Sequence, residues 1–423
     1  MATNATNAPV AALSRKFRIL LTLFLASMAF LNGVVYWSAR RQVLEGFPDY
    51  SIFYTAGQML RRGQGKTLYN NTLQLQVQRE FAIAAQTRTG PLPFNHPAFE
   101  AALFVPLVFL PYLVSYGLWI ALNAVLLVGI LAFLRRNGSC LHSAPRGLFF
   151  LAALAFFPIA YALMQGQDSI MLLGIFCLAY ARLRRGRDLE AGLWLGLGLF
   201  KFHLMLPFVF ILFLRRRWRA VLGVTICGVL DALVSWALIG GKEMLYYPRY
   251  AWEVNRHAPM HVIVPENMAN LRGLLTGWNW ARAAAPWPEI ALLAASLGLL
   301  IWAARQWDPA DRSDLVSWNN GFSIAMLSTF LASYHGYNQD MSILFLPLVL
   351  LSCRVLQSRS ESWYDFALRL GLGLMFFSPI YIVLTLHYSH QHLFALVLLG
   401  LAGVLAAENA ALKLGTLTEP LPT

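Results

Sequence analysis

The sequence predicts an all-α, polytopic membrane protein with about 12 transmembrane helices. Of its 423 residues, 58% are hydrophobic and only 13% are charged, whereas soluble domains usually carry about 25% charged residues. Apolar runs of roughly 15–24 residues recur along the chain, and about 20 such residues can cross a bilayer as a helix. The basic residues gather in short clusters at the ends of these runs.

Membrane topology accounts for the net charge of +13. Lys and Arg are enriched in cytoplasmic loops, and four basic clusters follow apolar runs, at Arg182–Arg187, Arg215–Arg219, Arg305–Arg312 and Arg354–Arg359. No basic stripe is interleaved with aromatic residues in the way that nucleic-acid binding requires. We therefore place the four clusters and both termini in the cytoplasm and predict no nucleic-acid partner.

This charge pattern sets the number of crossings. The first apolar run, 17–38, is longer than a signal-peptide core and is expected to stay as the first span. All four clusters can be cytoplasmic only if 98–110 is a short helix that does not cross and 189–214 forms two short spans. The twelve predicted spans are 17–38, 112–134, 146–164, 168–183, 189–201, 203–214, 218–239, 289–304, 314–333, 341–353, 363–386 and 391–411.

The chain is expected to form one transmembrane domain, residues 14–412, between a disordered cytoplasmic tail at 1–13 and a second cytoplasmic tail at 413–423. Two long outer segments, 39–100 and 240–288, interrupt the domain.

The first outer segment is predicted to contain amphipathic helices. Apolar residues recur at helical spacing over 50–62 and 68–88. Such helices are suited to lie at the membrane interface rather than to cross it.

Polar clusters that the charge rule does not explain all fall on the outer face in this topology. They are Asp49, Asn95-His96, Gln165–Asp168, Lys201–His203, the loop 240–288, Tyr334–Asp340 and His387–His392. One concave polar site on that face is the simplest explanation.

Several of these clusters resemble the motifs of glycosyltransferase family 87, a family of the GT-C superfamily. The resemblance covers roughly residues 45–350 and rests on Asp49–Tyr54 with Ala56-Gly57, Asn95-His96-Pro97 with Phe104–Leu107, Gln165–Ser169, Lys201-Phe202-His203, and Tyr334-His335 with Tyr337–Asp340. It implies a GT-C fold and a mannosyltransferase that uses a polyprenyl-phosphate sugar donor and a glycolipid or glycan acceptor. The implied location is the outer face of a bacterial plasma membrane.

Asp49 is the candidate catalytic base. It lies within a turn or two of the end of the first predicted span, where a carboxylate can ionise and still meet a lipid-borne substrate. A phosphate is already a competent leaving group, but the acceptor hydroxyl needs a base. A single carboxylate opposite the phosphate predicts inversion at the anomeric carbon. The alternative is that Asp49 caps the helix expected to begin near Tyr50; the resemblance favours the base.

Four residues are candidates to bind the donor phosphate: Lys201, His203, His335 and Arg272. Lys201 interrupts an apolar stretch, and ionisable residues in spans are usually functional, although it could instead mark a loop. His335 could donate to the phosphate or the sugar, or be an interfacial histidine bonded to backbone. Arg272 would suit bidentate contact with a phosphate.

The remaining candidates are polar residues that could bind the sugar or the acceptor. They are Gln165, Gln167, Asn95, His96, Asn267, Asn270, Tyr337 and Asn338. Gln165 and Gln167 could instead shape the site or end a helix hairpin. Tyr246, Trp278 and Trp280 could stack on a sugar, although interfacial anchoring is the commoner reason for such residues.

No cofactor or metal is expected. The nine histidines come without the thiolates or carboxylates that would complete a metal's ligand set. The competing function is a transporter or flippase for a lipid-linked sugar, which would use the same cavity without a base. A transporter should carry ionisable groups near the middle of the bilayer, whereas most of these residues fall near the outer ends of spans.

Overall fold

Helices make up every regular element in the part of the chain that the structure describes. The computed structural model describes residues 14–137, 145–257, 263–277, 287–358 and 362–414. No β-strand occurs within these ranges, so the predicted all-α class is confirmed. The predicted tail 1–13, and all but the first two residues of the predicted tail 413–423, lie outside the described residues.

Among the described residues, five helices are long and apolar enough to cross a membrane, or up to eight elements if each of three bent pairs is one span. The five are α1 (Arg15–Ser38), α6 (Tyr112–Asn137), α13 (Trp218–His257), α15 (Trp287–Gln306) and α20 (Phe394–Lys413). The pairs are α8 (Arg146–Ala155) with α9 (Phe157–Gln165), α11 (Asp188–Gly196) with α12 (Phe202–Leu214), and α18 (Trp363–Phe376) with α19 (Ser378–Ile382). The chain is therefore a multi-pass membrane protein.

Helix α16 (Leu315–Ala332) lies in the middle of the bundle. Every residue from Asn320 to Leu331 is buried, as expected of a helix that is apolar on all sides. It packs against α15, α20 and α17 (Phe345–Gln357). Helix α10 (Ser169–Arg184) is similarly buried and packs against α6 and α11.

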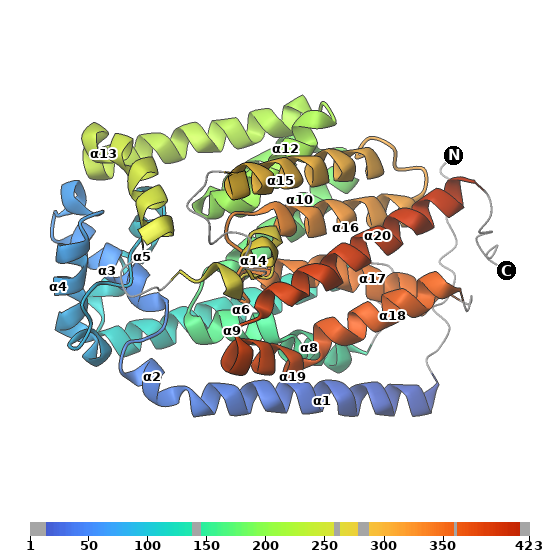
Figure 1. Ribbon diagram of the computed structural model, residues 1–423, viewed down its shortest axis with the longest axis horizontal. Helices are drawn as coiled ribbons and strands as arrows, with labels where there is room; N and C mark the ends of the chain where they lie inside the picture. Colours follow the sequence, from blue (N-terminus) through green and yellow to red (C-terminus); the bar gives the residue numbers. More distant parts are fainter. Residues whose placement is uncertain (1–13, 138–144, 258–262, 278–286, 359–361, 415–423) are drawn as a thin grey trace.

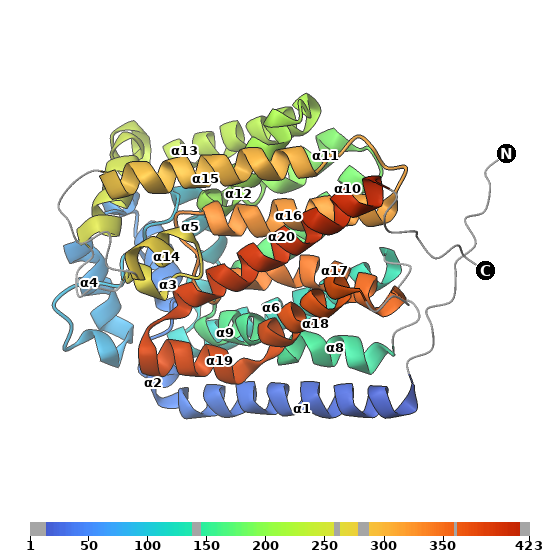
Figure 2. The same cartoon turned by 45° about the vertical axis from the view of Figure 1, so that its right-hand side comes forward.

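The two ends of the bundle differ. The long helices run side by side, with α1 along one edge (Figures 1 and 2). Short helices gather at the left end in Figure 1; they are α3 (Tyr50–Arg61), α4 (Asn71–Phe81) and α5 (Ala98–Phe104). The short helix α14 (Leu271–Gly277) lies nearer the middle of that view. The beginning of α1 and the end of α20 lie at the opposite end.

The short helices correspond to the outer segment that the sequence predicts. Helix α2 (Arg40–Leu44) continues from α1, and α3 and α4 fall within the two stretches of helical periodicity. Helix α5 has seven residues and is followed by a 3-10 turn at Leu107–Phe109. Seven helical residues span only about 10 Å at a rise of about 1.5 Å each, well short of a hydrocarbon core about 30 Å thick.

Ion pairs join the basic clusters at the end opposite these short helices. Asp188 contacts Arg217 and lies 3.9 Å from Arg312, and Arg215 lies 2.6 Å from Asp308. Three of the clusters that the sequence predicts on one side of the membrane therefore meet in space.

Helices α11 and α12 form a hairpin that enters and leaves the bundle at this basic end. Asp188 begins α11 and Arg217 follows α12, yet the two side chains form an ion pair. The hairpin packs tightly on α13, because a Cβ on Gly192 would lie 2.0 Å from the carbonyl oxygen of Ala220. Small residues allow such close approach of membrane helices. The tip of the hairpin carries Lys201.

Cysteine labelling tests the hairpin. We expect Arg187→Cys and Arg219→Cys, in a chain whose four native cysteines are replaced, to react with an impermeant maleimide only after permeabilisation of cells. Lys66→Cys, in the outer segment, should react in intact cells. Labelling of Arg187→Cys and Arg219→Cys from opposite sides would show that α11 and α12 together cross the membrane once.

Candidate active site

Asp49 lies at the start of α3, but its carboxylate does not cap that helix. The side chain accepts no hydrogen bond from the first turn of α3. Its Oδ2 instead accepts a hydrogen bond of 2.7 Å from Nε2 of Gln167, and Nε2 of Gln339 lies 3.5 Å from the same oxygen. The carboxylate, which is partly exposed, is thus directed away from the helix and toward the other candidate residues.

The turn between α9 and α10 supplies the partners of Asp49. Gly166 has a φ of +62°, and a Cβ there would lie 2.8 Å from the Cβ of Tyr50. Glycine is therefore what lets this turn rest against α3. On one side of it, Oε1 of Gln165 accepts a hydrogen bond of 3.2 Å from the backbone N–H of Asp49; on the other, Gln167 holds the carboxylate.

Lys201 is enclosed by oxygen atoms. Its Nζ lies 2.6 Å from Oδ1 of Asp340 and 2.9 Å from Oδ1 of Asp168. The same nitrogen donates to Oγ of Ser169 at 2.7 Å and to Oε1 of Gln167 at 3.1 Å. An ammonium group has three donors, so these four oxygens occupy all of them.

Gln167 connects this buried cluster to Asp49. Its Oε1 accepts from Lys201 while its Nε2 donates to Asp49. A neutral amide with one end on a cation and the other on a carboxylate is fixed in orientation, because reversing it would put a donor against a donor.

A more accessible layer lies beside the buried cluster. Asp49, His96, His203 and His335 are partly exposed, whereas Lys201 is buried. The rings of His203 and His335 lie 5.5 Å apart between centroids. Their Nε2 atoms are buried without a hydrogen-bond partner among the described residues. Because buried polar atoms are nearly always paired, these two nitrogens could bind polar atoms of a substrate.

Burial shifts the pKa of the groups in this layer that lie outside the spans. It lowers the pKa of His96 to about 4. The pKa of His335 is lowered by burial first and then by His203 and Arg272. Both imidazoles are therefore neutral near pH 7. Burial raises the pKa of Asp49 above its ordinary value, and the hydrogen bond from Gln167 opposes that shift.

Glu100 lies beside Asp168, and ligand atoms of the two carboxyl groups lie within 4.8 Å of each other. Burial, and then the negative charge of Asp168, raise the pKa of Glu100 well above its ordinary value. This shift favours the neutral form of Glu100 next to the ion pair of Asp168 and Lys201.

Arg272 reaches the site from α14. Its guanidinium lies over the ring of Tyr334, 4.0 Å from the centroid, which is a favourable cation–π arrangement. One nitrogen lies 3.3 Å from the carbonyl oxygen of Tyr334 and 3.4 Å from Oδ1 of Asn255. Arg272 therefore contacts the residue that precedes His335, the neighbouring predicted phosphate ligand, and its positive charge helps to lower the pKa of His335.

Other predicted residues serve the local structure. Asn270 donates to the carbonyl of Ser333 at 2.7 Å and accepts from the N–H of Gly273. The hydroxyl of Tyr337 accepts from the N–H of Val264 at 3.0 Å. The carbonyl of Asn95 accepts from the hydroxyl of Tyr247 at 3.1 Å.

Two predicted asparagines keep an unused acceptor. Asn338 donates to the hydroxyl of Thr385 at 2.9 Å. Its Oδ1 and that of Asn267 are buried without a hydrogen-bond partner in the described part of the chain. Trp278 and Trp280 lie outside the described residues.

His96, Glu100 and Asp168 also have the composition of a metal site, with three ligand atoms that lie within 4.8 Å of one another. Two features compete with a cation there. The ammonium of Lys201 already lies 2.9 Å from Asp168, and Nδ1 of His96 already lies 2.7 Å from Oε2 of Glu100. Metal independence stays a prediction.

The family model for glycosyltransferase family 87 matches residues 94–333, which is more than half of the chain. The chain belongs to glycosyltransferase family 87. The match contains Gln165–Ser169, Lys201 and Arg272, whereas Asp49 and the segment from Tyr334 to Asp340 lie outside it.

The family 87 chain is also similar to a characterised enzyme. It is 27% identical over 184 residues to the polyprenol-phosphate-mannose-dependent alpha-(1-2)-phosphatidylinositol pentamannoside mannosyltransferase of Mycolicibacterium smegmatis. The aligned part is 43% of this chain and 44% of the relative, so the chain spans less than half of the relative's length. None of the solved structures matches the chain. The family makes the protein a glycosyltransferase, which favours that reading over a transporter.

Sequence analysis missed the acidic residues that hold Lys201. Asp168 and Asp340 lie within two of the motifs that resemble family 87, but neither they nor Glu100 are among the predicted site residues. A signal was present, because a lysine buried in apolar sequence needs a counter-ion, and both aspartates lie next to polar turns.

Replacing Lys201 tests how far the site depends on it. We expect Lys201→Met to leave Asp168 and Asp340 buried and unpaired, since their side chains are only 3% and 6% exposed. Breaking a buried pair costs about 3–5 kcal/mol, which should lower the thermal unfolding temperature of the detergent-purified protein clearly. Lys66→Met, at an exposed lysine, is the control. Adding Asp340→Asn to Lys201→Met should recover part of the lost stability. If Lys201→Met and Lys66→Met unfolded at the same temperature, the assignment of Lys201 as a buried ion-pair partner would be contradicted.

Proposed function

We propose that this glycosyltransferase moves a hexose, expected to be mannose, from a polyprenyl-phosphate carrier to a hydroxyl group of a glycolipid or glycan, with inversion. The motif resemblance and the similarity to the Mycolicibacterium smegmatis relative, which is a polyprenol-phosphate-mannose-dependent enzyme, support the choice of donor. The acceptor oxygen attacks the anomeric carbon, its proton passes to the enzyme, and the bond from that carbon to the phosphate oxygen breaks.

The arrangement of Asp49 carries the proposal. A carboxylate at a helix N-terminus usually caps the helix, but that of Asp49 is held by Gln167. The elevated pKa makes it a better proton acceptor than an ordinary aspartate, since catalytic efficiency improves as the pKa of the base approaches the working pH. We assign Asp49 as the general base.

The departing phosphate would meet neutral and cationic donors. We propose that His203, His335 and Arg272 bind it, because each imidazole has a nitrogen without a hydrogen-bond partner among the described residues and the guanidinium contacts Tyr334, the residue before His335. Preorganised donors in a dry site stabilise developing charge most effectively. Lys201 could bind the phosphate directly, as the sequence predicts, only by exchanging one of its four oxygen partners. Its contacts favour a role in which it orients Gln167.

The remaining candidates are proposed to contact sugar or acceptor hydroxyls, or to shape the cavity. Asn267 and Asn338 each have an acceptor atom that no other described residue contacts through a hydrogen bond, which suits contact with hydroxyl groups. The residues whose polar groups are largely engaged are proposed to set the shape of the site; they are Gln165, Gln167, Asn95, His96, Asn270 and Tyr337.

The site is proposed to face the outside of a bacterial plasma membrane in a chain with twelve crossings and a GT-C fold. Helix α10 runs from the site at Ser169 to the basic end at Arg184. Its 16 residues correspond to about 24 Å at a rise of about 1.5 Å each. Since the hydrocarbon core is about 30 Å thick, a cytoplasmic basic end places the site near the outer boundary.

Asp49→Asn tests the base. Purified protein in detergent would be given short-chain polyprenyl-phosphate-mannose and crude membrane lipid as acceptor. We expect wild type to form a chelator-resistant product and Asp49→Asn to lose at least ~100-fold in rate, because general-base catalysis is worth about 10²–10⁴-fold.

Glu45→Gln, an acid-to-amide change at the end of α2, is the matched control and should keep full activity. Equal activity of Asp49→Asn and wild type would show that the base lies elsewhere. Failure of wild type to form any product would reject the proposed donor, and loss of product with a chelator would reject metal independence.

The pH dependence separates the two glutamines. Asp49 must be ionised to act, so kcat/KM should fall as the pH drops through its pKa, which burial raises. Gln167→Leu removes a hydrogen bond that lowers this pKa and should move the acid limb of the profile to higher pH. Gln165→Leu loses the bond from the backbone N–H of Asp49 and the bond to the hydroxyl of Tyr161, but none to the carboxylate of Asp49, so it should leave the limb in place. A shift to lower pH in Gln167→Leu would contradict the assignment.

A further inference from the structure

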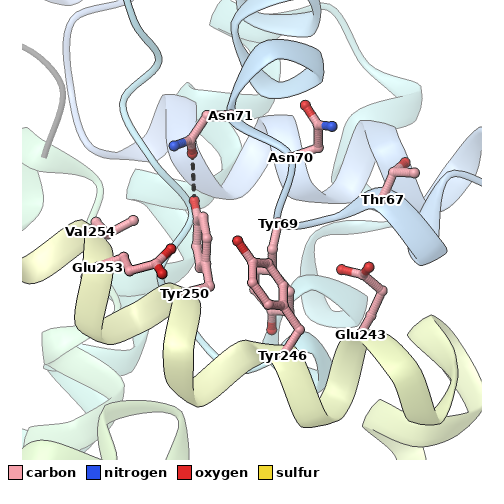
Figure 3. Close-up of a pocket in the computed structure, with 9 residues that line it drawn as sticks. All are labelled: Thr67, Tyr69, Asn70, Asn71, Glu243, Tyr246, Tyr250, Glu253 and Val254. Carbon is pink, nitrogen blue, oxygen red and sulfur yellow. Dashed lines mark hydrogen bonds between the residues drawn. The ribbon is translucent and has the colours of Figure 1, made fainter. Parts of the chain in front are cut away.

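A separate cavity of about 680 Å³ lies between the outer segment and the second half of α13. Residues near the start of α4 line one side, and residues that follow the kink of α13 at Gly240 line the other (Figure 3). The nine lining residues are Thr67, Tyr69, Asn70, Asn71, Glu243, Tyr246, Tyr250, Glu253 and Val254. The volume is within the ~300–1,000 Å³ usual for ligand pockets.

Tyrosine rings held in fixed positions form part of the wall. The ring centroids of Tyr69 and Tyr250 lie 5.0 Å apart, and those of Tyr246 and Tyr250 lie 6.1 Å apart. Tyr250 donates to Oδ1 of Asn71 at 2.8 Å (Figure 3). Tyr246 is the exposed member, 38% accessible, so its ring is available to a ligand. Rigid rings supply apolar contact at little cost in conformational entropy.

The charges of the wall define the kind of ligand. The nine lining residues include two carboxylates, Glu243 and Glu253, and no Lys, Arg or His. An anion such as a phosphate would be repelled. Glu253 already forms an ion pair of 2.7 Å with Arg249, which reduces the attraction for a cation. Carboxylate, amide and hydroxyl groups between aromatic rings suit an uncharged ligand rich in hydroxyl groups.

One segment, residues 95–96, lies between this cavity and the candidate active site. The hydroxyl of Tyr69 donates to the carbonyl of His96 at 3.0 Å, and that of Tyr247 donates to the carbonyl of Asn95. The side chain of His96 turns the other way, toward Glu100. The segment 95–96 therefore separates the cavity from the buried cluster around Asp168 and Lys201.

From this placement we propose that the cavity binds uncharged sugar units of the acceptor, outside the reacting centre. This assignment deepens the proposed transfer reaction and rests on it for the identity of the ligand as acceptor. The carboxylates exclude the phosphate of the donor, and the room exceeds that of a single sugar ring. A saccharide held here would restrain an acceptor beside the segment that carries His96.

Binding of trisaccharides, without any donor, tests the proposal. Saturation-transfer NMR on the detergent-purified full chain would use mannotriose and maltotriose as neutral probes and mannose 6-phosphate as a charged one. We expect at least one trisaccharide to bind, and Tyr246→Ala and Glu243→Ala each to weaken that binding about tenfold, as truncation of anchoring residues commonly does. Leu245→Ala, at a neighbouring residue that is 84% exposed and does not line the cavity, should bind as wild type does.

Mannose 6-phosphate should bind more weakly than the trisaccharides and be insensitive to Tyr246→Ala. Two results would overturn the proposal: no binding of either trisaccharide to wild type, or binding that Tyr246→Ala and Glu243→Ala leave unchanged. Asp49→Asn should keep trisaccharide binding. Trisaccharide binding in this cavity without any sugar transfer would overturn the proposed reaction. Sugar transfer without such binding would overturn only the assignment of the cavity as a saccharide site.

Discussion

The ammonium of Lys201 between the carboxylates of Asp168 and Asp340 is the interaction on which the rest of the site depends. It joins the hairpin of α11 and α12, the turn before α10 and the segment after α16. Buried charges are costly unless they are paired, so these three segments are constrained to meet at one point. Gln167 extends the same network to Asp49, which links the packing of the bundle to the orientation of the candidate base.

The site has a buried group of residues that hold one another and a partly exposed group that could contact a substrate. Lys201, Asp168, Asp340 and Glu100 are buried, and their polar groups are directed at one another. Asp49 and the histidines beside them are partly exposed, and Nε2 of His203 and of His335 finds no hydrogen-bond partner in the described part of the chain. Such an arrangement is suited to transfer from a phosphate carrier, because fixed dipoles and neutral imidazoles can receive the leaving group without reorganising. The separate cavity lined by Tyr246 is the place where we propose that the part of an acceptor that does not react would bind.

Much of the fold follows from apolar periodicity and from the position of arginines. The three basic clusters at Arg182–Arg187, Arg215–Arg219 and Arg305–Arg312 meet at one end, as the positive-inside rule requires. The same rule predicts that residues 189–214 return to the side they left, and the ion pair between Asp188 and Arg217 brings the two ends of this segment together. Most of the candidate residues, from Asp49 to Asn338, also come together, because the topology leaves their polar clusters at one end.

The sequence alone determined the class of protein, the family resemblance and the residues that gather at one end of the bundle, since these depend on composition, local periodicity and motifs. It left open whether Asp49 caps α3, and it did not anticipate that Lys201 is enclosed by acidic partners or that Glu100 lies beside Asp168. Those facts depend on contacts between residues far apart in the sequence, such as Lys201 and Asp340, which are 139 positions apart, and no local pattern specifies them. Only the tertiary structure decided how each polar group is used, because packing alone sets which buried donors and acceptors find partners.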